Sequence, residues 1–328
     1  GRLSGQVPAV AYTLGQACWF GLLLIGSFGV VYNLLAWPRS AQRTVEPEAV
    51  RFSGQAVDGG LLAAVLVAIT GNGQVILEWS YANGWLIDGI ASWFAVHNFP
   101  TNARVTNDWF ISNDWWWWRS GRVLEDLDLM GNHIEVIAEF PMFSYLLGDN
   151  HPHVIAMPVV LAVIGLAMNV VFRGATGLWR SDEAWLERLS RLFPMRWVGL
   201  LVVIVVSGTL LFLNTWDYPP YWLLLVAAVF VAAFSRKRLA SEDNAFGTGI
   251  SAAAAVGVIL AVGALLLYLP YFLTAQSQAG GFLPNLFNPT RLPQFLLFFG
   301  IGLSALVVLI VSSWSRHRPG WGKTGITN

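Results

Sequence analysis

Three side chains that could perform chemistry lie close together near the middle of the chain. Asp149, His151 and His153 alternate with other residues in the sequence GDNHPH. If the backbone is extended there, alternate side chains point to one face, and Pro152 favours an extended conformation for His151. One carboxylate and two imidazoles suit zinc, manganese or a comparable divalent ion. The pattern therefore predicts a divalent metal site (Mg²⁺, Mn²⁺ or Zn²⁺) with Asp149, His151 and His153 as its ligands, and Asp149 is also a candidate catalytic acid.

The same segment has other interpretations. Pro152 in the first turn of a helix would leave free backbone N–H groups beside it, and such groups bind phosphate readily, so a metal and a phosphate could share the site. Alternatively, Asp149 or Asn150 caps the helix and the histidines lie in the membrane interface. The pattern D-x-H-x-H is short enough to occur by chance, so the residues alone leave these alternatives open.

A second polar segment follows a long apolar run at Asn214–Trp222, NTWDYPPYW. Asp217 is a candidate catalytic acid, and Asn214 and Tyr218 are candidate substrate-binding residues. The alternative is that Asp217 caps the next helix, which has proline in its first turn. If both polar segments lie on one face of a membrane, they could converge in one pocket.

A third unusual segment is Trp115–Trp118, which is followed by two arginines. Four consecutive tryptophans cannot all lie on one face of a helix, so they form either an interfacial anchor or a platform for sugar rings or isoprenoid chains. In the second case Arg119 or Arg122 could bind phosphate. Glu139 precedes a Phe-Pro bend and is a third candidate acid. Arg291 could bind a lipid phosphate or extend to head groups in general.

The composition defines the class of protein. Of 328 residues, 55% are hydrophobic and only 12% are charged, and 17 are tryptophan. The mean hydropathy is +0.57. These values predict an integral membrane protein. The formal net charge is zero and no Lys/Arg block interleaves with aromatic residues, so nucleic acid is excluded as an expected partner.

The apolar segments predict an all-α polytopic bundle of about seven transmembrane helices, since about 20 residues of helix cross a bilayer. The second segment contains Gly71–Gln74, GNGQ, which indicates a broken or cavity-lining helix and not one that faces lipid. The expected spans are residues 7–37, 60–77, 153–172, 197–214, 220–235, 250–272 and 294–314.

The loops suggest an organisation in three parts. Residues 1–77 hold the first two spans, residues 78–152 form a long external loop with aromatic residues and short interfacial helices such as Leu86–Val96, and residues 153–328 hold five further spans. Basic residues concentrate in alternate loops. By the positive-inside rule, this pattern predicts a multi-pass protein of the cell (cytoplasmic) membrane with its polar motifs on the non-cytoplasmic face. An odd number of spans and a start at Gly1 favour a fragment of a longer chain.

Three motifs carry a resemblance to a known family: EFPMFSYLLGDNHPHVIAMP, WWWRSGRV and NTWDYPPYW. Over most of its length the chain resembles the YYY-type integral membrane proteins of Chloroflexi and Archaea. That family is in turn similar to the GT-C superfamily of polyprenyl-phosphate-sugar-dependent glycosyltransferases, whose active sites lie on the non-cytoplasmic face. The chain departs from the GT-C pattern because no acidic motif precedes its first span.

The resemblance implies a GT-C-like fold and a membrane-embedded glycosyltransferase that takes its sugar from a polyprenyl-phosphate donor. A carboxylate among Glu139, Asp149 and Asp217 would deprotonate the acceptor hydroxyl. A cation or an arginine would stabilise the departing phosphate. The alternative is a non-catalytic structural or accessory subunit, whose aromatic loop contacts lipids or protein partners in a larger membrane complex.

Overall fold

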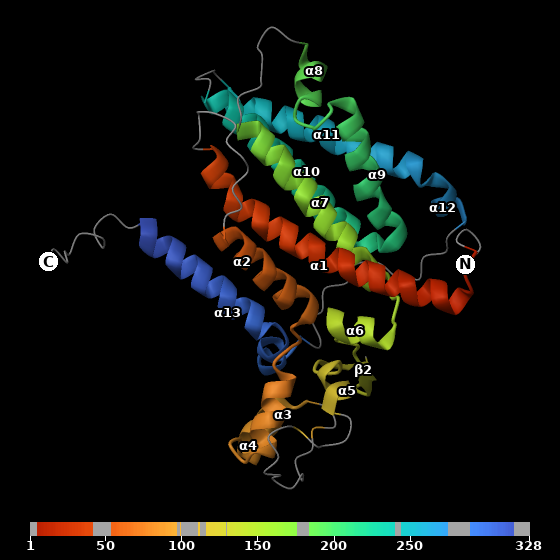
Figure 1. Ribbon diagram of the computed structural model, residues 1–328, viewed down its shortest axis with the longest axis vertical. Coiled ribbons are helices and arrows are strands. Elements are labelled where there is room, and N and C mark those ends of the chain that lie inside the picture. The colour runs from red at the N-terminus through yellow and green to blue at the C-terminus, as the bar shows by residue number, and fades with distance from the viewer. Residues whose placement is uncertain are drawn as a thin grey trace, which may run out of the picture. The chain divides into compact units, whose positions relative to one another are not determined.

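Helices make up nearly all of the regular structure (Figure 1). The exception within the described part of the chain is one two-stranded ribbon, so the predicted helical class is confirmed and the ribbon was not predicted. Two compact units are present, residues 1–68 with 145–280 and residues 69–144 with 281–328. The computed structural model describes residues 5–41, 54–96, 99, 111, 116–128, 130–175, 184–239, 244–274 and 289–317.

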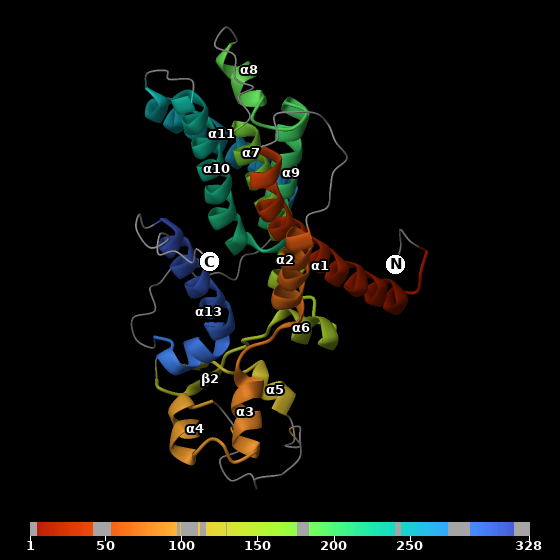
Figure 2. The same ribbon diagram turned by 60° about the vertical axis from the view of Figure 1, so that its left-hand side comes forward.

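The first unit is a bundle of long helices. Helix α10 packs against both α7 and α11, α9 contacts α7 and α11, and α1 packs against α7 and α2 (Figures 1 and 2). The elements of this unit are α1 (Pro8–Ala41), α2 (Gly54–Ala64), the π-helical turn η1 (Val65–Ile69), α7 (Pro152–Ala175), α8 (Trp185–Ser190), α9 (Trp197–Leu213), η2 (Thr215–Asp217), α10 (Tyr218–Leu239), α11 (Ala245–Leu267) and α12 (Leu269–Thr274).

The long helices of this bundle are apolar on all sides over most of their length, which is why they bundle without burying their outer faces. Leu210, Leu225 and Leu260 are buried in the common core, whereas large side chains such as Leu223 and Val258 stay exposed. A helix that is hydrophobic all round belongs in a membrane or in a large core. Exposed leucine and valine on several helices of one bundle indicate lipid contact.

Within the described ranges, four helices are long and apolar enough to cross a membrane. A fifth candidate span consists of Gly54–Ile69 and Gln74–Ala82, which are bent by 75° at their break, as the GNGQ sequence predicted. The expected count of seven is not confirmed, because Trp197–Leu213 and Leu292–Val308 are shorter apolar helices. They fall below the roughly 20 residues that a span needs. The four spans are Pro8–Trp37, Pro152–Phe172, Thr215–Ser235 and Ala245–Leu267.

The second unit contains short elements and one long helix. Helix α3 contacts α5, and α4 contacts α13. Helix α4 lies inside the predicted interfacial helix Leu86–Val96, and the boundary with the first unit falls within α6. The elements are α3 (Gln74–Ala82), α4 (Asp88–Phe94), α5 (Trp116–Ser120), β1 (Glu125–Leu127), β2 (His133–Glu135), α6 (Pro141–Leu147) and α13 (Leu292–His317).

The ribbon forms because its turn is closed by one aspartate. Strands β1 and β2 are antiparallel, with Asp126 opposite Ile134. The Asp128 carboxylate accepts hydrogen bonds from the backbone N–H of Met130 and from Asn132. The Asn132 side chain is the largest cause of a lowered pKa of Asp128, so this carboxylate stays ionised and keeps the turn closed at neutral pH.

The orientation in the membrane stays a prediction. Part of the basic sequence on which it depends lies outside the described residues, namely Arg43, Arg51, Arg180, Arg318 and Lys323. The three-part division at residues 77 and 152 likewise stays a prediction.

One glycine sets the start of α9 and gives a direct test of this packing. A Cβ atom at Gly199 would lie 1.7 Å from the carbonyl oxygen of Pro194, so the backbone must shift in Gly199→Ala. We expect a loss of roughly 1–3 kcal/mol in unfolding free energy, measured by thermal unfolding in detergent. The control is Gly21→Ala, where no atom lies within 4 Å and alanine favours the helix. Equal stability of the two variants would contradict this geometry.

Candidate functional site

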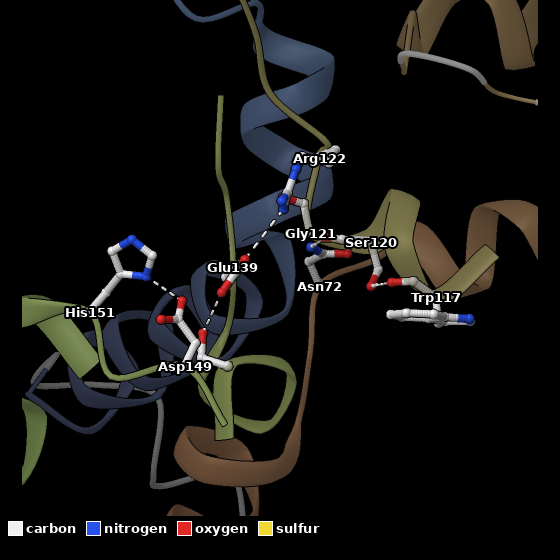
Figure 3. A network of polar contacts seen from close by, with 9 residues as sticks. Asn72, Trp117, Ser120, Gly121, Arg122, Glu139, Asp149 and His151 are labelled. Atoms are coloured by element: carbon white, nitrogen blue, oxygen red, sulfur yellow. Dashed lines mark hydrogen bonds and ion pairs between the residues drawn. The ribbon is translucent and has the colours of Figure 1, made fainter. Parts of the chain in front are cut away.

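A carboxylate and an imidazole form a pair just before α7. The Asp149 carboxylate is hydrogen-bonded to Nδ1 of His151 (Figure 3). The side chain of His151 is 51% exposed and that of Asp149 is 24% exposed, so the pair is accessible. The rings of His151 and His153 are stacked with centroids 5.7 Å apart. Helix α7 begins at Pro152, so the predicted extended backbone ends at His151 and His153 lies in the first helical turn.

The turn between α9 and α10 brings a second carboxylate to this cluster. The Asn214 side chain donates a hydrogen bond of 3.0 Å to Asp217, and Asp217 interacts electrostatically with His153. The structure thus brings Asp149, His151, His153 and Asp217 into one neighbourhood. Tyr218 is different, because its buried hydroxyl donates to the carbonyl of Leu260 at 3.2 Å. Its predicted contact with a substrate has no support in this geometry.

Hydrogen bonds from aromatic side chains of α1 and α6 hold the segment that carries the Asp149–His151 pair. The Tyr12 hydroxyl donates to the carbonyl oxygen of Gly148, which has the positive φ of 69° that glycine adopts easily. The Trp19 indole N–H donates to Ile155 at 2.7 Å, and the Tyr145 hydroxyl donates to Val154 at 3.3 Å. Burial raises the pKa of Tyr145 to about 12, so its phenol stays a neutral donor at physiological pH.

An apolar groove of about 600 Å³ lies among α1, α7 and α9. Trp19 lines it at the end where its indole reaches Ile155. On α7, the lining begins at Pro158, five residues or about 7.5 Å after His153. On α9, Thr209 lines the groove, and Asn214 lies five residues after it, about 7.5 Å along the helix. The polar cluster therefore lies at one end of the groove. Other lining residues are Gly29, Asn33, Gly165 and Phe172.

The metal prediction gains no support from this arrangement. Among the described residues, no three His, Cys, Asp or Glu side chains are grouped so that they could hold a metal ion. The side chains of Asp149 and His151 are bonded to each other. A divalent ion on Asp149, His151 and His153 stays a prediction.

A buried ion pair lies in the second unit beside the broken span. Arg119 donates to both carboxylate oxygens of Glu78, at 2.5 and 2.9 Å, and the two side chains are 11% and 1% exposed. The Gln74 side chain donates to the same carboxylate at 3.0 Å. Asn72, which lies beside Ser120 in Figure 3, donates to the carbonyl of Ser120 at 2.6 Å. The Asn72 side chain also accepts the N–H of Gln74 at 3.0 Å. The Arg119 guanidinium is thus committed to Glu78, and its predicted phosphate contact lacks support.

Glu78 was not among the site residues predicted from the sequence. The signal was present, because Gln74 and Glu78 are four residues apart and so lie on one face of a helix. A carboxylate directly after an apolar segment also requires a counter-charge when it is buried. Which arginine supplies that charge depends on tertiary structure.

A second, partly buried pair follows along the same segment. Arg122 donates to the carbonyl of Gly121 at 2.8 Å and to Glu139 at 3.4 Å, and its guanidinium lies 4.3 Å from the ring centre of Trp118. Ser144 donates to Glu139 at 2.8 Å. The contact between Arg122 and Glu139 is visible in Figure 3. The Glu139 side chain is only 5% exposed, so it connects the start of α6 to α5.

The remaining predicted residues lie on the surface or outside the described part. Arg291 is exposed and donates to the carbonyl of Trp93 at 3.4 Å. Three of the four consecutive tryptophans, Trp116–Trp118, are described in or beside α5, and Trp115 lies outside the described residues.

Comparison with known families identifies the chain at a coarse level. Residues 1–326 match the family described as uncharacterized membrane protein (DUF2298). The chain belongs to this family. Membership agrees with the apolar helices in assigning an integral membrane protein. No curated protein and no solved structure matches the chain. The match includes no link to the YYY-type proteins or to GT-C enzymes, so these two resemblances stay predictions from motifs.

The buried pair of the second unit allows a quantitative test. Glu78→Gln leaves the Arg119 charge buried without a counter-charge, and we expect a loss of about 3–5 kcal/mol in unfolding free energy. The double variant Glu78→Gln/Arg119→Gln should recover part of that loss. Denaturant unfolding in detergent measures both.

The matched control is Glu187→Gln, which breaks the exposed pair with Arg196 at 3.4 Å. An exposed pair contributes about 0–1 kcal/mol. If Glu78→Gln and Glu187→Gln cost the same, the Glu78–Arg119 pair does not stabilise the fold as described.

Proposed function

We propose that the protein is a membrane enzyme that transfers a sugar from a polyprenyl-phosphate donor to a hydroxyl group of an acceptor. The supporting observation is the position of the Asp149–His151 pair at one end of the apolar groove. The groove would hold the isoprenoid chain, and the pair would act on the head group. The donor class and the non-cytoplasmic location of the reaction come from the motif resemblance and are part of the proposal.

The Asp149–His151 pair has the arrangement of a general base. A carboxylate bonded to Nδ1 favours the tautomer with its proton on that nitrogen, which leaves Nε2 as a proton acceptor. Among the described residues, Asp149 bonds to Nδ1 of His151 and none bonds to Nε2. The His151 side chain is half exposed. General-base catalysis of this type contributes about 10²–10⁴-fold in rate.

In the proposed step, Nε2 of His151 takes the proton of the acceptor hydroxyl. The acceptor oxygen forms a bond to the anomeric carbon of the sugar. The bond between that carbon and the phosphate oxygen breaks, and the phosphate leaves with the electron pair. The imidazole of His153 and its backbone N–H group would bind the leaving phosphate. Asn214 and Asp217 would bind sugar hydroxyls.

The dimensions of the groove suit a long apolar chain. From Trp19 to Asn33, α1 contributes lining residues over 14 residues, or about 21 Å. The lining is mostly aliphatic or aromatic, and most of it belongs to α1 and α7, which are long enough to cross a bilayer. A lipid tail buried there leaves its head group near the polar end.

The alternative function, a non-catalytic accessory subunit, is favoured by a different observation. Two buried carboxylates form internal ion pairs, Glu78 with Arg119 and Glu139 with Arg122. These two carboxylates are therefore not available to a substrate. If the Asp149–His151 pair has no effect on sugar transfer, this alternative gains weight.

The first test measures sugar transfer from a polyprenyl-phosphate donor by membranes that carry the full-length protein. His151→Ala should lower the rate by about 10²–10⁴-fold, because the general base is lost, and Asp149→Asn should lower it less. The control is His133→Ala, an exposed histidine of β2, which should transfer at the wild-type rate. Equal rates for His151→Ala and wild type would remove the pair from the mechanism.

The second test fills the groove. Gly165 lines the groove and Gly21 does not. A Cβ atom at either position would meet no atom within 4 Å. Both leucine variants should therefore fold. Gly165→Leu should raise KM for the donor about tenfold, which corresponds to about 1.4 kcal/mol, with little change in kcat, whereas Gly21→Leu should match wild type. Unchanged KM in Gly165→Leu would show that the donor chain binds elsewhere.

A further inference from the structure

The second unit contains an apolar groove of its own. It has a volume of about 510 Å³ and lies among α3, α4 and α13. Its lining is almost entirely hydrophobic and includes Leu77, Ile90, Trp93, Leu297 and Gly300. Trp93 and Ile90 are also exposed, so the groove opens at the surface of the unit.

Buried hydrogen bonds fix the walls of this groove. Gln294 is fully buried; its amide donates to the carbonyl of Ala95 at 2.9 Å, and its oxygen accepts the N–H of Glu125 at 3.3 Å. The N–H of Gly73 donates to the carbonyl of Leu297 at 2.7 Å. The first turns of α13 are therefore held against the chain before α3 and after α4, and the groove between them is preformed.

A cation lies at the edge of the groove. Arg291 directly precedes α13 and donates to the carbonyl of Trp93 at 3.4 Å, and Trp93 is itself a lining residue. This contact places the guanidinium beside Trp93, at the edge of the groove. Among the described side chains, no carboxylate forms an ion pair with Arg291. A permanent positive charge beside an apolar groove is complementary to a lipid with an anionic head group.

We propose that this groove binds an acyl chain of an anionic phospholipid whose phosphate lies on Arg291. An anionic lipid is favoured over a zwitterionic one, because the zwitterionic head group brings its own cation to an edge that already carries one. The proposal is independent of the sugar-transfer function. The two grooves share no residue and lie in different units.

The charge of the site is tested by lipid binding to the purified full-length protein in detergent. Native mass spectrometry compares phosphatidylglycerol with phosphatidylcholine of the same acyl chains. We expect wild type to prefer phosphatidylglycerol by about tenfold, Arg291→Gln to lose the preference, and Arg291→Lys to keep most of it. The control is Arg196→Gln, at an exposed arginine of the first unit, which should keep the preference. A preference that survives in Arg291→Gln would overturn the proposal.

The apolar part of the site is tested with two glycines of α13. A Cβ atom at Gly300 or at Gly302 would meet no atom within 4 Å, but only Gly300 lines the groove. Gly300→Leu should weaken binding of both lipids, and Gly302→Leu should bind as wild type does. Lipid binding that is unchanged in Gly300→Leu would overturn the proposal. Displacement of phosphatidylglycerol by equimolar glycerol phosphate would also overturn it, because the site would then recognise a free phosphate.

Discussion

The ion pair between Glu78 and Arg119 is the interaction on which the second unit depends. The apolar segment that begins with α2 breaks before α3, and a break in an apolar environment exposes backbone and side-chain polar groups that must be satisfied internally. Asn72 bonds to Ser120 and Gln74, Gly73 bonds to Leu297, and Glu78 bonds to Arg119. These contacts fix α5 and the start of α13 against α3. Since an unpaired buried charge costs several kcal/mol, the position of α5, and with it that of Trp118 and Arg122, follows from this pair.

The polar residues of the two units differ in whether their side chains remain accessible for chemistry. In the second unit, Glu78 and Glu139 are almost completely buried and are paired with arginines, so their oxygens are occupied by structural contacts. In the first unit, the carboxylate of Asp149 holds only one ring nitrogen of a half-exposed His151. Chemistry requires a group that is oriented but still accessible. This difference, and not the number of charged residues, places the candidate site at the start of α7.

The sequence predicted those features that depend on local order. The helical class follows from long apolar segments, the break at Gly71–Gln74 from glycine and amide groups inside one of them, and the start of α7 from Pro152. The span count is not confirmed, because hydropathy does not define where a helix ends and α9, with 17 residues, is shorter than the roughly 20 residues of a typical crossing. Arg122 and Glu139 were both selected as site residues, but their mutual pairing was not, since it depends on contacts 17 positions apart. The same limit hid the partner of Glu78.

The two grooves have a similar architecture but suit different functions. Each is an apolar channel between packed helices with a polar group at one end. At the end of the first groove, the polar group is a carboxylate–imidazole pair, which can accept and return a proton. At the edge of the second, it is a guanidinium, which keeps its charge at any physiological pH and cannot act as a base. A lipid-linked substrate that must react and leave suits the first groove, whereas a lipid that must only stay bound suits the second. The chemistry of the end group therefore decides which groove is a site of reaction and which is a site of attachment.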